Sequence, residues 1–236
     1  MIAMSEHLVP SALASRSTAI SIDLVLCTRH GRNLAVLLVR AHRQLQNARE
    51  RWVLPRAALA EGASLEETAA NGAAHSCGIR PAWLAQVGAF GAAPRRSRRT
   101  ALSVVYVGVT PESPTPPPEG SRWFAADNLP LLTAERRAVV IAALGTLRER
   151  TDYAPIAFRL LPRSFSLGEL QEVYEVLLGR RLHKASFRRA LKAAQLVKPT
   201  DTWRCEGRGR PAQLFRFAPR RRRGSQRGVR FERLGG

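Results

Sequence analysis

The sequence is poor in cysteine and has no long apolar run, and each shortage argues against a class of protein. Its three cysteines, Cys27, Cys77 and Cys205, are an odd number without a close pair, which argues against a disulfide framework and suits a reducing compartment. No uncharged apolar run approaches the roughly 18 residues that a membrane helix needs. Residues 1–15 lack the basic and apolar segments of a secretory signal. We therefore expect a cytoplasmic protein with no membrane partner.

Acidic residues are also scarce. The chain has 18 Asp and Glu against 38 Lys and Arg, a formal net charge of +20. Such an excess predicts a polyanionic partner, nucleic acid in preference to an anionic membrane surface. Residues 156–236 contain 20 basic and 6 acidic residues, whereas residues 1–155 contain 18 and 12. The surface for this partner is therefore expected mainly toward the C-terminus, and the two parts of the chain are expected to differ in role.

The first part of the chain mixes strand and helix patterns. Two apolar, β-rich segments, residues 20–29 and 33–43, flank the turn signal HGRN and predict a hairpin. Residues 101–109 are almost continuously apolar and predict a central strand. Four further elements are expected: a strand at 83–91, an exposed proline-rich connection at 110–120, a short strand with a turn at 122–130, and a helix at 133–150 capped by Thr133. The mixture predicts one α/β domain.

Another helix is expected to begin after Ser64 and to end at Gly78. Ser64 and Glu67 form a capping box, and the glycine suits a left-handed helix end. A stripe of mostly small side chains is expected to be buried: Leu65, Ala69, Ala70, Ala73 and Ala74. Gly72 lies mid-helix, where glycine costs about 1 kcal/mol relative to alanine. Either this position has drifted, or another part of the chain packs closely against it.

The pattern changes after residues 152–155. Ser166 and Glu169 form a second capping box, and apolar residues then recur with helical spacing up to Gly179. A second helix follows at 184–195, and two β-like arms, 196–200 and 212–218, enclose a basic tip. Two helices and such a hairpin predict a winged helix-turn-helix. The expected organisation is a loose arm (1–15), an α/β domain (16–152), a winged helix (153–218) and a basic disordered tail (219–236).

The second helix of a helix-turn-helix enters the major groove of DNA. Here it presents five candidate contacts: Lys184, Ser186, Arg188, Arg189 and Lys192. Arg208 and Arg210 at the wing tip are candidates for a neighbouring groove or the backbone. A solvated basic helix in a protein–protein module is the alternative, and the agreement of capping, spacing, wing and charge favours DNA. The run Arg220 to Arg223 fits equally a non-specific phosphate-binding arm and a solubilising end.

Residues 52–79 have the layout of a phosphate-binding motif. Their sequence, WVLPRAALAEGASLEETAANGAAHSCGI, contains a short apolar segment, a turn, a capped helix and a glycine that ends the helix. This frame resembles a Nudix box, in which glutamates on one helix face hold Mg²⁺ against a diphosphate. With Gly78 and Ile79 on the last two positions, the glycine and charged positions hold other residues: Ala57, Ala63, Asn71, Gly72, His75 and Ser76. We therefore expect no catalytic residue, no metal and no cofactor.

Residues 17–218 resemble the Nudix-related transcriptional regulators, the NrtR group. The resemblance rests on WVLP (52–55), FGAAPRRSRRTALSVVY (90–106), RWFAADNLP (122–130) and residues 153–191, with L-P, F-S-L, E-L-Q-x-V-Y-E and F-R-R in that order. It implies an α+β protein: an N-terminal Nudix-like α/β/α sandwich with a mixed sheet and a C-terminal winged helix-turn-helix. It also implies a repressor of NAD-related metabolism that binds a palindromic operator in double-stranded DNA as a homodimer.

The resemblance further implies a small-molecule effector. Its pattern gives four candidate ligand-binding residues: Arg95, Arg98, Ser103 and Tyr106. The two arginines either clamp a phosphate or belong to a basic loop that contacts DNA or solvent. Family acids near them are replaced, for example by Ala92 and Arg96. Among ADP-ribose, another nucleotide and a nicotinate-like metabolite, a metal-free anion therefore fits better than a Mg²⁺–diphosphate.

Two other functions stay open. A sequence-independent nucleic-acid-binding protein would use the wing and the tail, although its basic region has few aromatic residues for stacking on bases. An active Nudix hydrolase with a basic appendage is disfavoured by the missing carboxylates. Equal binding to all sequences would favour the first alternative, and Mg²⁺-dependent cleavage of ADP-ribose would favour the second.

Overall fold

The computed structural model describes residues 19–41, 51–59, 62–91, 101–112, 116–152, 154–205 and 211–218. Four sequence predictions lie outside the described residues: the N-terminal arm, the basic loop with Arg95 and Arg98, the wing tip with Arg208 and Arg210, and the C-terminal tail. The domain boundaries therefore remain predictions. No helix in the described part of the chain is long and apolar enough to cross a membrane.

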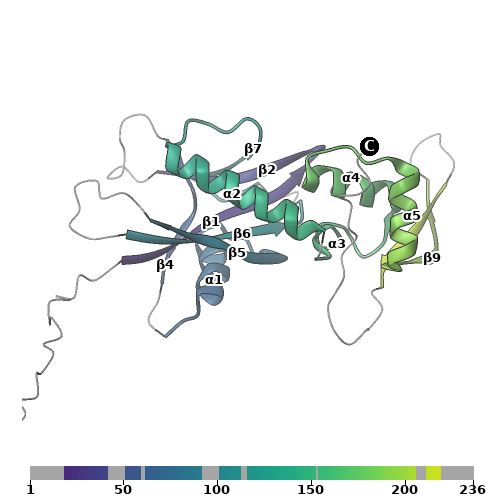
Figure 1. Cartoon of the computed structure of the whole chain (residues 1–236), viewed down its shortest axis with the longest axis horizontal. Helices are drawn as coiled ribbons and strands as arrows, with labels where there is room; N and C mark the ends of the chain where they lie inside the picture. The colour runs from purple at the N-terminus through teal and green to yellow at the C-terminus, as the bar shows by residue number, and fades with distance from the viewer. Residues whose placement is uncertain are drawn as a thin grey trace, which may run out of the picture.

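The N-terminal part is built around one mixed sheet (Figure 1). Its strands are β1 (Ala19–His30), β2 (Asn33–Arg40), β3 (Trp52–Val53), β4 (Arg56–Ala58), β5 (Trp83–Gly91), β6 (Ala101–Thr110) and β7 (Ser121–Ala125). The order is β3-β2-β1-β6-β5, with β4 paired to β1 and β7 to β2. β1 and β6 run parallel and the other pairs antiparallel. The predicted hairpin and the central position of β6 are confirmed, whereas β3 and β4 were not predicted because they are only two and three residues long.

Two helices cover the two faces of this sheet. On one face α1 (Leu65–Cys77) packs Ala69 and Ala73 against Leu24 of β1. On the other face α2 (Ala134–Thr151) packs Leu147 into the cluster that contains Val25 and Val107. Side chains of a strand alternate between faces, so each strand serves both layers. The predicted α/β/α sandwich is confirmed.

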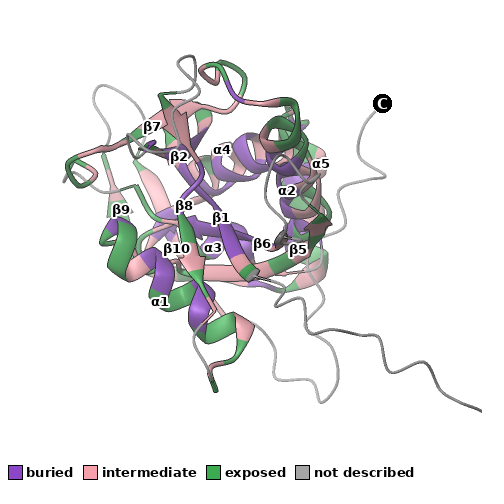
Figure 2. Ribbon diagram, turned by 90° about the vertical axis from the view of Figure 1, so that its left-hand side faces the viewer, coloured by how far each residue is buried: buried purple, intermediate pink, exposed green. Residues whose placement is uncertain are grey.

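The ends of α1 are as predicted, but its buried stripe differs by part of a turn. The capping box of Ser64 and Glu67 is formed, and Gly78 ends the helix with a φ of 61°. Ala70 is exposed, so its predicted burial was wrong; Figure 2 shows the helix buried on one side and exposed on the other. The buried residues are Thr68, Ala69, Gly72, Ala73 and Cys77. A Cβ on Gly72 would lie 2.5 Å from the Cβ of Ala57 in β4, so close packing explains the glycine.

The C-terminal part forms a winged helix, as predicted. Its elements are α3 (Ile156–Arg159), β8 (Phe165–Ser166), α4 (Leu167–Leu178), α5 (Lys184–Ala194), β9 (Val197–Arg204) and β10 (Ala212–Phe217). The three strands form a sheet in the order β8-β10-β9. α4 has the predicted capping box and ends at Gly179 with a φ of 67°. α3 and β8 were missed, because elements of four and two residues are too short for a periodic pattern.

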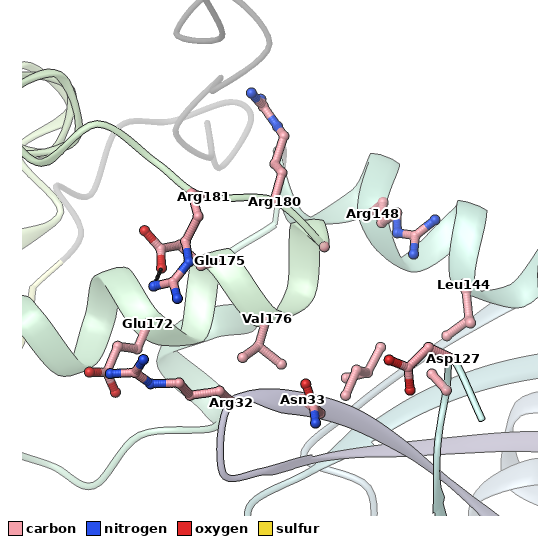
Figure 3. A pocket seen from close by; sticks show the side chains of 13 residues that line it. Arg32, Asn33, Asp127, Leu144, Arg148, Glu172, Glu175, Val176, Arg180 and Arg181 are labelled. Carbon is pink, nitrogen blue, oxygen red and sulfur yellow. Dashed lines mark hydrogen bonds and ion pairs between the residues drawn. The ribbon is translucent and has the colours of Figure 1, made fainter. Parts of the chain in front are cut away.

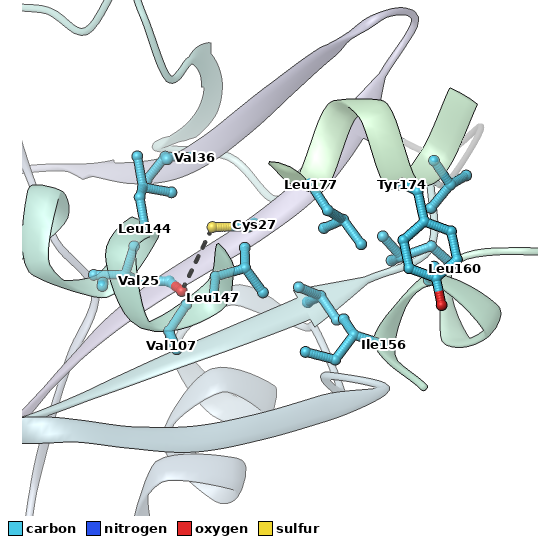
Figure 4. Packing of buried hydrophobic residues seen from close by; sticks show 14 of the residues in the cluster. Val25, Cys27, Val36, Val107, Leu144, Leu147, Ile156, Leu160, Tyr174 and Leu177 are labelled. Atoms are coloured by element: carbon cyan, nitrogen blue, oxygen red, sulfur yellow. Dashed lines mark hydrogen bonds between the residues drawn. The ribbon is translucent and has the colours of Figure 1, made fainter. Parts of the chain in front are cut away.

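One hydrophobic core joins the two parts. Cys27 of β1, Leu147 of α2, Ile156 of α3, and Tyr174 and Leu177 of α4 belong to a single buried cluster (Figure 4). The sandwich and the winged helix therefore share one apolar interior. This packing fixes the position of α4, and through it that of α5, relative to the sheet.

Candidate nucleic-acid interface and sensor site

α5 is amphipathic, with a narrow apolar side and a broad basic side. Phe187 and Leu191 are buried, and the Phe187 ring meets the Tyr174 ring edge-on at a centroid distance of 5.7 Å. Four of the predicted contact residues are exposed on the helix: Lys184, Arg188, Arg189 and Lys192. The helix contains no acidic residue. Because three of these cations are spaced i, i+4 and i+8, they form one row along the helix surface.

Ser186, the fifth predicted contact, is half-buried and lies beside the start of α5. Its Oγ is 3.3 Å from Nδ1 of His183, the residue that precedes the helix. This places Ser186 at the junction with the preceding turn and away from the row of cations. A phosphate contact through its hydroxyl remains a prediction.

The turn between α4 and α5 is held by Glu175, which the sequence did not reveal. Its carboxylate accepts hydrogen bonds from Leu182 N at 2.9 Å and from Gln171 Nε2 at 3.0 Å, and lies 3.2 Å from Arg181 Nη1. Burial alone would raise the pKa of Glu175, but the hydrogen bonds and Arg181 outweigh it and lower the pKa. An ionised carboxylate therefore fixes the angle at which α5 leaves α4.

The wing adds further basic surface beside α5. Lys198 of β9 lines a cavity of about 610 Å³ together with Arg188 and Lys192, and its lining contains no acidic residue. Its lining also includes apolar side chains, among them Leu191 and Phe215. Lys198 was not predicted as a contact; the only sequence signal was its place next to Pro199 in an arm assigned to the wing. A polyanion lying along α5 would reach Lys198 as well.

The outer face of α1 carries the positions where a Nudix box holds metal ligands. Asn71, His75 and Ser76 are exposed there, and His75 Nδ1 lies 2.7 Å from the carbonyl oxygen of Asn71. In the described ranges no group of three His, Cys, Asp or Glu residues could hold a metal ion. The helix therefore lies where the Nudix box predicts it, but its exposed side carries Asn71, His75 and Ser76 in place of carboxylates.

Ser103 and Tyr106 of β6, both predicted to bind the effector, lie on opposite faces of the sheet. Ser103 Oγ donates a hydrogen bond to Asp23 Oδ2 at 2.7 Å on the face covered by α2. Tyr106 is only 1% exposed, on the face covered by α1, and its hydroxyl donates to Glu66 Oε1 at 3.0 Å. Burial, and then the Glu66 carboxylate, raises the pKa of Tyr106 to about 12. The structure thus separates these two residues.

A polar cluster that the sequence did not reveal surrounds Ser103. Asp23 of β1 is 8% exposed and pairs with Arg56 of β4, whose Nε lies 2.6 Å and Nη2 3.1 Å from the two carboxylate oxygens. The hydrogen bonds to Asp23 raise the pKa of Arg56. Ser103, Asp23 and Arg56 are far apart in the sequence, and the pairing of β1 with β4 and β6 brings them together.

A Nudix-like sandwich joined to a winged helix with an exposed basic helix is the architecture of a two-domain DNA-binding regulator. Residues 157–217 match the model of the NrtR DNA-binding winged helix domain. The chain is 29% identical over 210 residues to the "ADPR responsive transcriptional repressor NtrR" of Acinetobacter baylyi, covering 86% of this chain and 83% of that protein. It is homologous over both parts to the NrtR-type, Nudix-related transcriptional regulators.

Solved structures agree with this assignment. NrtR of Shewanella oneidensis in complex with a 27mer DNA superposes with a TM-score of 0.70 at 28% identity, over 85% of this chain and 94% of that one. A MutT/nudix family protein from Enterococcus faecalis superposes with a TM-score of 0.68 at 17% identity, over 86% and 89%. The second likeness establishes the fold alone.

Proposed function

We propose that the chain is a transcriptional repressor that binds double-stranded DNA through α5 and the wing. The observation that carries this proposal is the row of exposed cations on α5, a helix without an acidic residue. Arg188 and Arg189 are suited to guanine edges because a guanidinium donates two parallel hydrogen bonds, whereas Lys184, Lys192 and Ser186 suit phosphates. The similarity to S. oneidensis NrtR, which was solved with a 27mer DNA, supports the assignment.

The Nudix-like domain, residues 16–152, is proposed to sense a nucleotide or an NAD-related metabolite without cleaving it. The A. baylyi relative is ADPR responsive, which makes ADP-ribose the first effector to test. Cleavage of a diphosphate by a Nudix box needs carboxylates that hold Mg²⁺, and the corresponding positions on α1 hold Asn71, Gly72, His75 and Ser76. A sensor that leaves its effector intact reports a steady concentration.

Regulation in this proposal acts through a homodimer. Two winged helices must lie about one helical turn of DNA apart, or a multiple of it, to bind both halves of a palindromic operator. An effector changes DNA binding only if its affinity differs between the arrangements of the two subunits that do and do not fit this spacing. Because the chain resembles the NrtR group, the genes under its control are proposed to be those of NAD-related metabolism.

Selection of bound duplexes from a random DNA pool, at physiological salt and with or without ADP-ribose, tests this function. We expect a palindromic motif in one of the two conditions and a change of affinity in the other. Equal binding to all duplexes in both conditions would instead support sequence-independent nucleic-acid binding. Incubation of the protein with ADP-ribose and Mg²⁺ tests whether the Nudix-like domain hydrolyses this ligand, and we expect the ADP-ribose to remain intact.

A further inference from the structure

A cavity of about 510 Å³ lies between the N-terminal sandwich and the winged helix, away from both α5 and α1. It is lined by the turn between β1 and β2, the segment that follows β7, the C-terminal half of α2, and α4 with the turn after it (Figure 3). Small-molecule sites in proteins commonly have this size and commonly lie where two domains meet. The cavity is therefore large enough for a metabolite that contacts both parts of the chain.

Guanidinium groups outnumber carboxylates around this cavity. Its charged lining residues are Arg32, Arg148, Arg180, Arg181, Asp127, Glu172 and Glu175. Two of the carboxylates are already engaged: Glu172 Oε2 lies 2.9 Å from Arg29 Nη2, and Glu175 Oε2 lies 3.2 Å from Arg181 Nη1. The lining itself has four guanidinium groups and three carboxylates, and Arg29, which does not line the cavity, offsets the charge of Glu172. The lining as a whole therefore favours an anion.

Arg148 is the best-placed anchor. It projects from α2 toward the C-terminal end of α4, where a Cβ on Gly179 would lie 3.3 Å from Arg148 Nη2. Within the described ranges Arg148 has no carboxylate at ion-pair distance. Figure 3 shows its guanidinium on the same side of the cavity as Leu144 and Asp127, with Val176 and Asn33 farther from it. A guanidinium in this position can donate two parallel hydrogen bonds to an oxyanion.

We propose that this cavity is a second ligand site, which binds a small molecule carrying a phosphate or carboxylate group. Arg148 holds the oxyanion, Leu144 and Val176 contact the apolar part of the ligand, and Asn33 lines another part of the same cavity. The site is distinct from the polar cluster around Ser103. Because Asn33 and Arg148 belong to the sandwich and Val176 to α4, the ligand contacts both parts at once.

Isothermal titration calorimetry of the full chain at physiological salt tests this proposal. Inorganic pyrophosphate and malonate are the two probes, and the comparison distinguishes a phosphate from a carboxylate ligand. Arg148→Gln removes the anchoring charge with little change in helix propensity. Asn33→Asp adds a negative charge to the lining at almost unchanged size. Arg137→Gln removes the same charge from an exposed position of α2 outside the cavity and is the matched control.

For the probe that binds more tightly we expect both cavity variants to lose at least tenfold in affinity and the control to keep the wild-type affinity. Any other pattern overturns the proposal. In particular, a similar loss in all three variants would show general attraction of anions to a basic protein. If Arg148→Gln does not fold, as judged by its thermal unfolding, Asn33→Asp against the control decides. The titration contains no DNA, so it can fail or succeed independently of the proposed repressor function.

Discussion

Arg204 Nη1 lies 2.8 Å from Glu169 Oε1, so the first strand of the wing is tied to the N-terminus of α4. The same glutamate accepts a hydrogen bond from Ser166 N at 2.6 Å as part of the capping box. One carboxylate thus holds together the two parts of the winged helix that must keep a fixed geometry on DNA. Its removal is expected to affect both the stability of the helix start and the position of the wing.

Substitutions at Glu169 should separate its charge from its capping role. Glu169→Gln can still cap α4 but loses the ion pair, and we expect it to destabilise the fold by about 0.5–1 kcal/mol at pH 7. Glu169→Ala should cost about 1–2 kcal/mol because it removes the cap as well. Urea unfolding of both variants and the wild type measures these differences.

The pH dependence of this effect has a definite sign. Burial alone would raise the pKa of Glu169, but hydrogen bonds from Ser166 and Arg204 lower it below its usual value. The stabilisation is therefore fully present above the unfolded pKa of about 4.3 and is lost as the pH falls through the lower folded pKa. The difference between wild type and Glu169→Gln should shrink between pH 5 and pH 3. A constant difference over that range would contradict this account.

Gly72→Ala should destabilise the protein although alanine is the better helix former. The added Cβ would lie 2.5 Å from Ala57 Cβ, and forcing β4 away from α1 is expected to cost about 1–3 kcal/mol, more than the roughly 1 kcal/mol gained in helix propensity. The double variant Gly72→Ala with Ala57→Gly should recover much of the loss. Thermal unfolding of the two variants and the wild type measures this, and a Gly72→Ala variant as stable as wild type would disprove the close contact.

Arg188→Ala should weaken binding to the selected operator by about 1–3 kcal/mol and relax the base preference at one position. The reason is that Arg188 lies in the exposed row of α5 and can reach a base edge. Arg159→Ala removes the same charge from an exposed position of α3, outside α5, and should change affinity little. Fluorescence anisotropy with the operator and with single-base variants provides the measurement. An equal loss on every duplex would show that Arg188 contacts only phosphate.

Only one face of the sheet is expected to contact the effector of the Nudix-like domain. Ser103→Ala should weaken ADP-ribose binding roughly fivefold, the effect of one lost hydrogen bond. Tyr106→Phe should leave the affinity unchanged, because the Tyr106 hydroxyl is buried under α1 and directed to Glu66. Calorimetric titration with ADP-ribose distinguishes the two variants. The reverse result would move the effector site to the α1 face.

Thiol labelling should report on burial directly. Cys205 is exposed, whereas Cys27 and Cys77 are buried, and burial raises their pKa to about 12 and about 11. A thiolate is the reactive species, so a thiol reagent at pH 8 should modify one cysteine per native chain and three after denaturation. Rapid labelling of two or three cysteines in the native protein would show that one of the buried pair becomes accessible.

The features that could be predicted from sequence are those that depend on neighbouring residues. Ser64 with Glu67 and Ser166 with Glu169 each lie three residues apart, and the apolar spacing of α4 and α5 repeats within one helix. The pairs Asp23–Arg56 and Arg29–Glu172 span 33 and 143 residues and depend on the whole fold. Ser103 and Tyr106 are a different case: they lie three residues apart in a predicted strand, so the alternation of side chains already places them on opposite faces.

The single apolar core that contains Cys27, Leu147 and Leu177 has a consequence for how such regulators are engineered or diversified. Cutting the chain after α2 would expose apolar surface on both fragments, so neither fragment is expected to fold stably on its own. A chimaera that joins this winged helix to another sensor domain would have to keep the side chains of β1 and α2 that pack against it. The two parts are thus expected to change together in evolution, in contrast to domains that are joined only by a flexible linker.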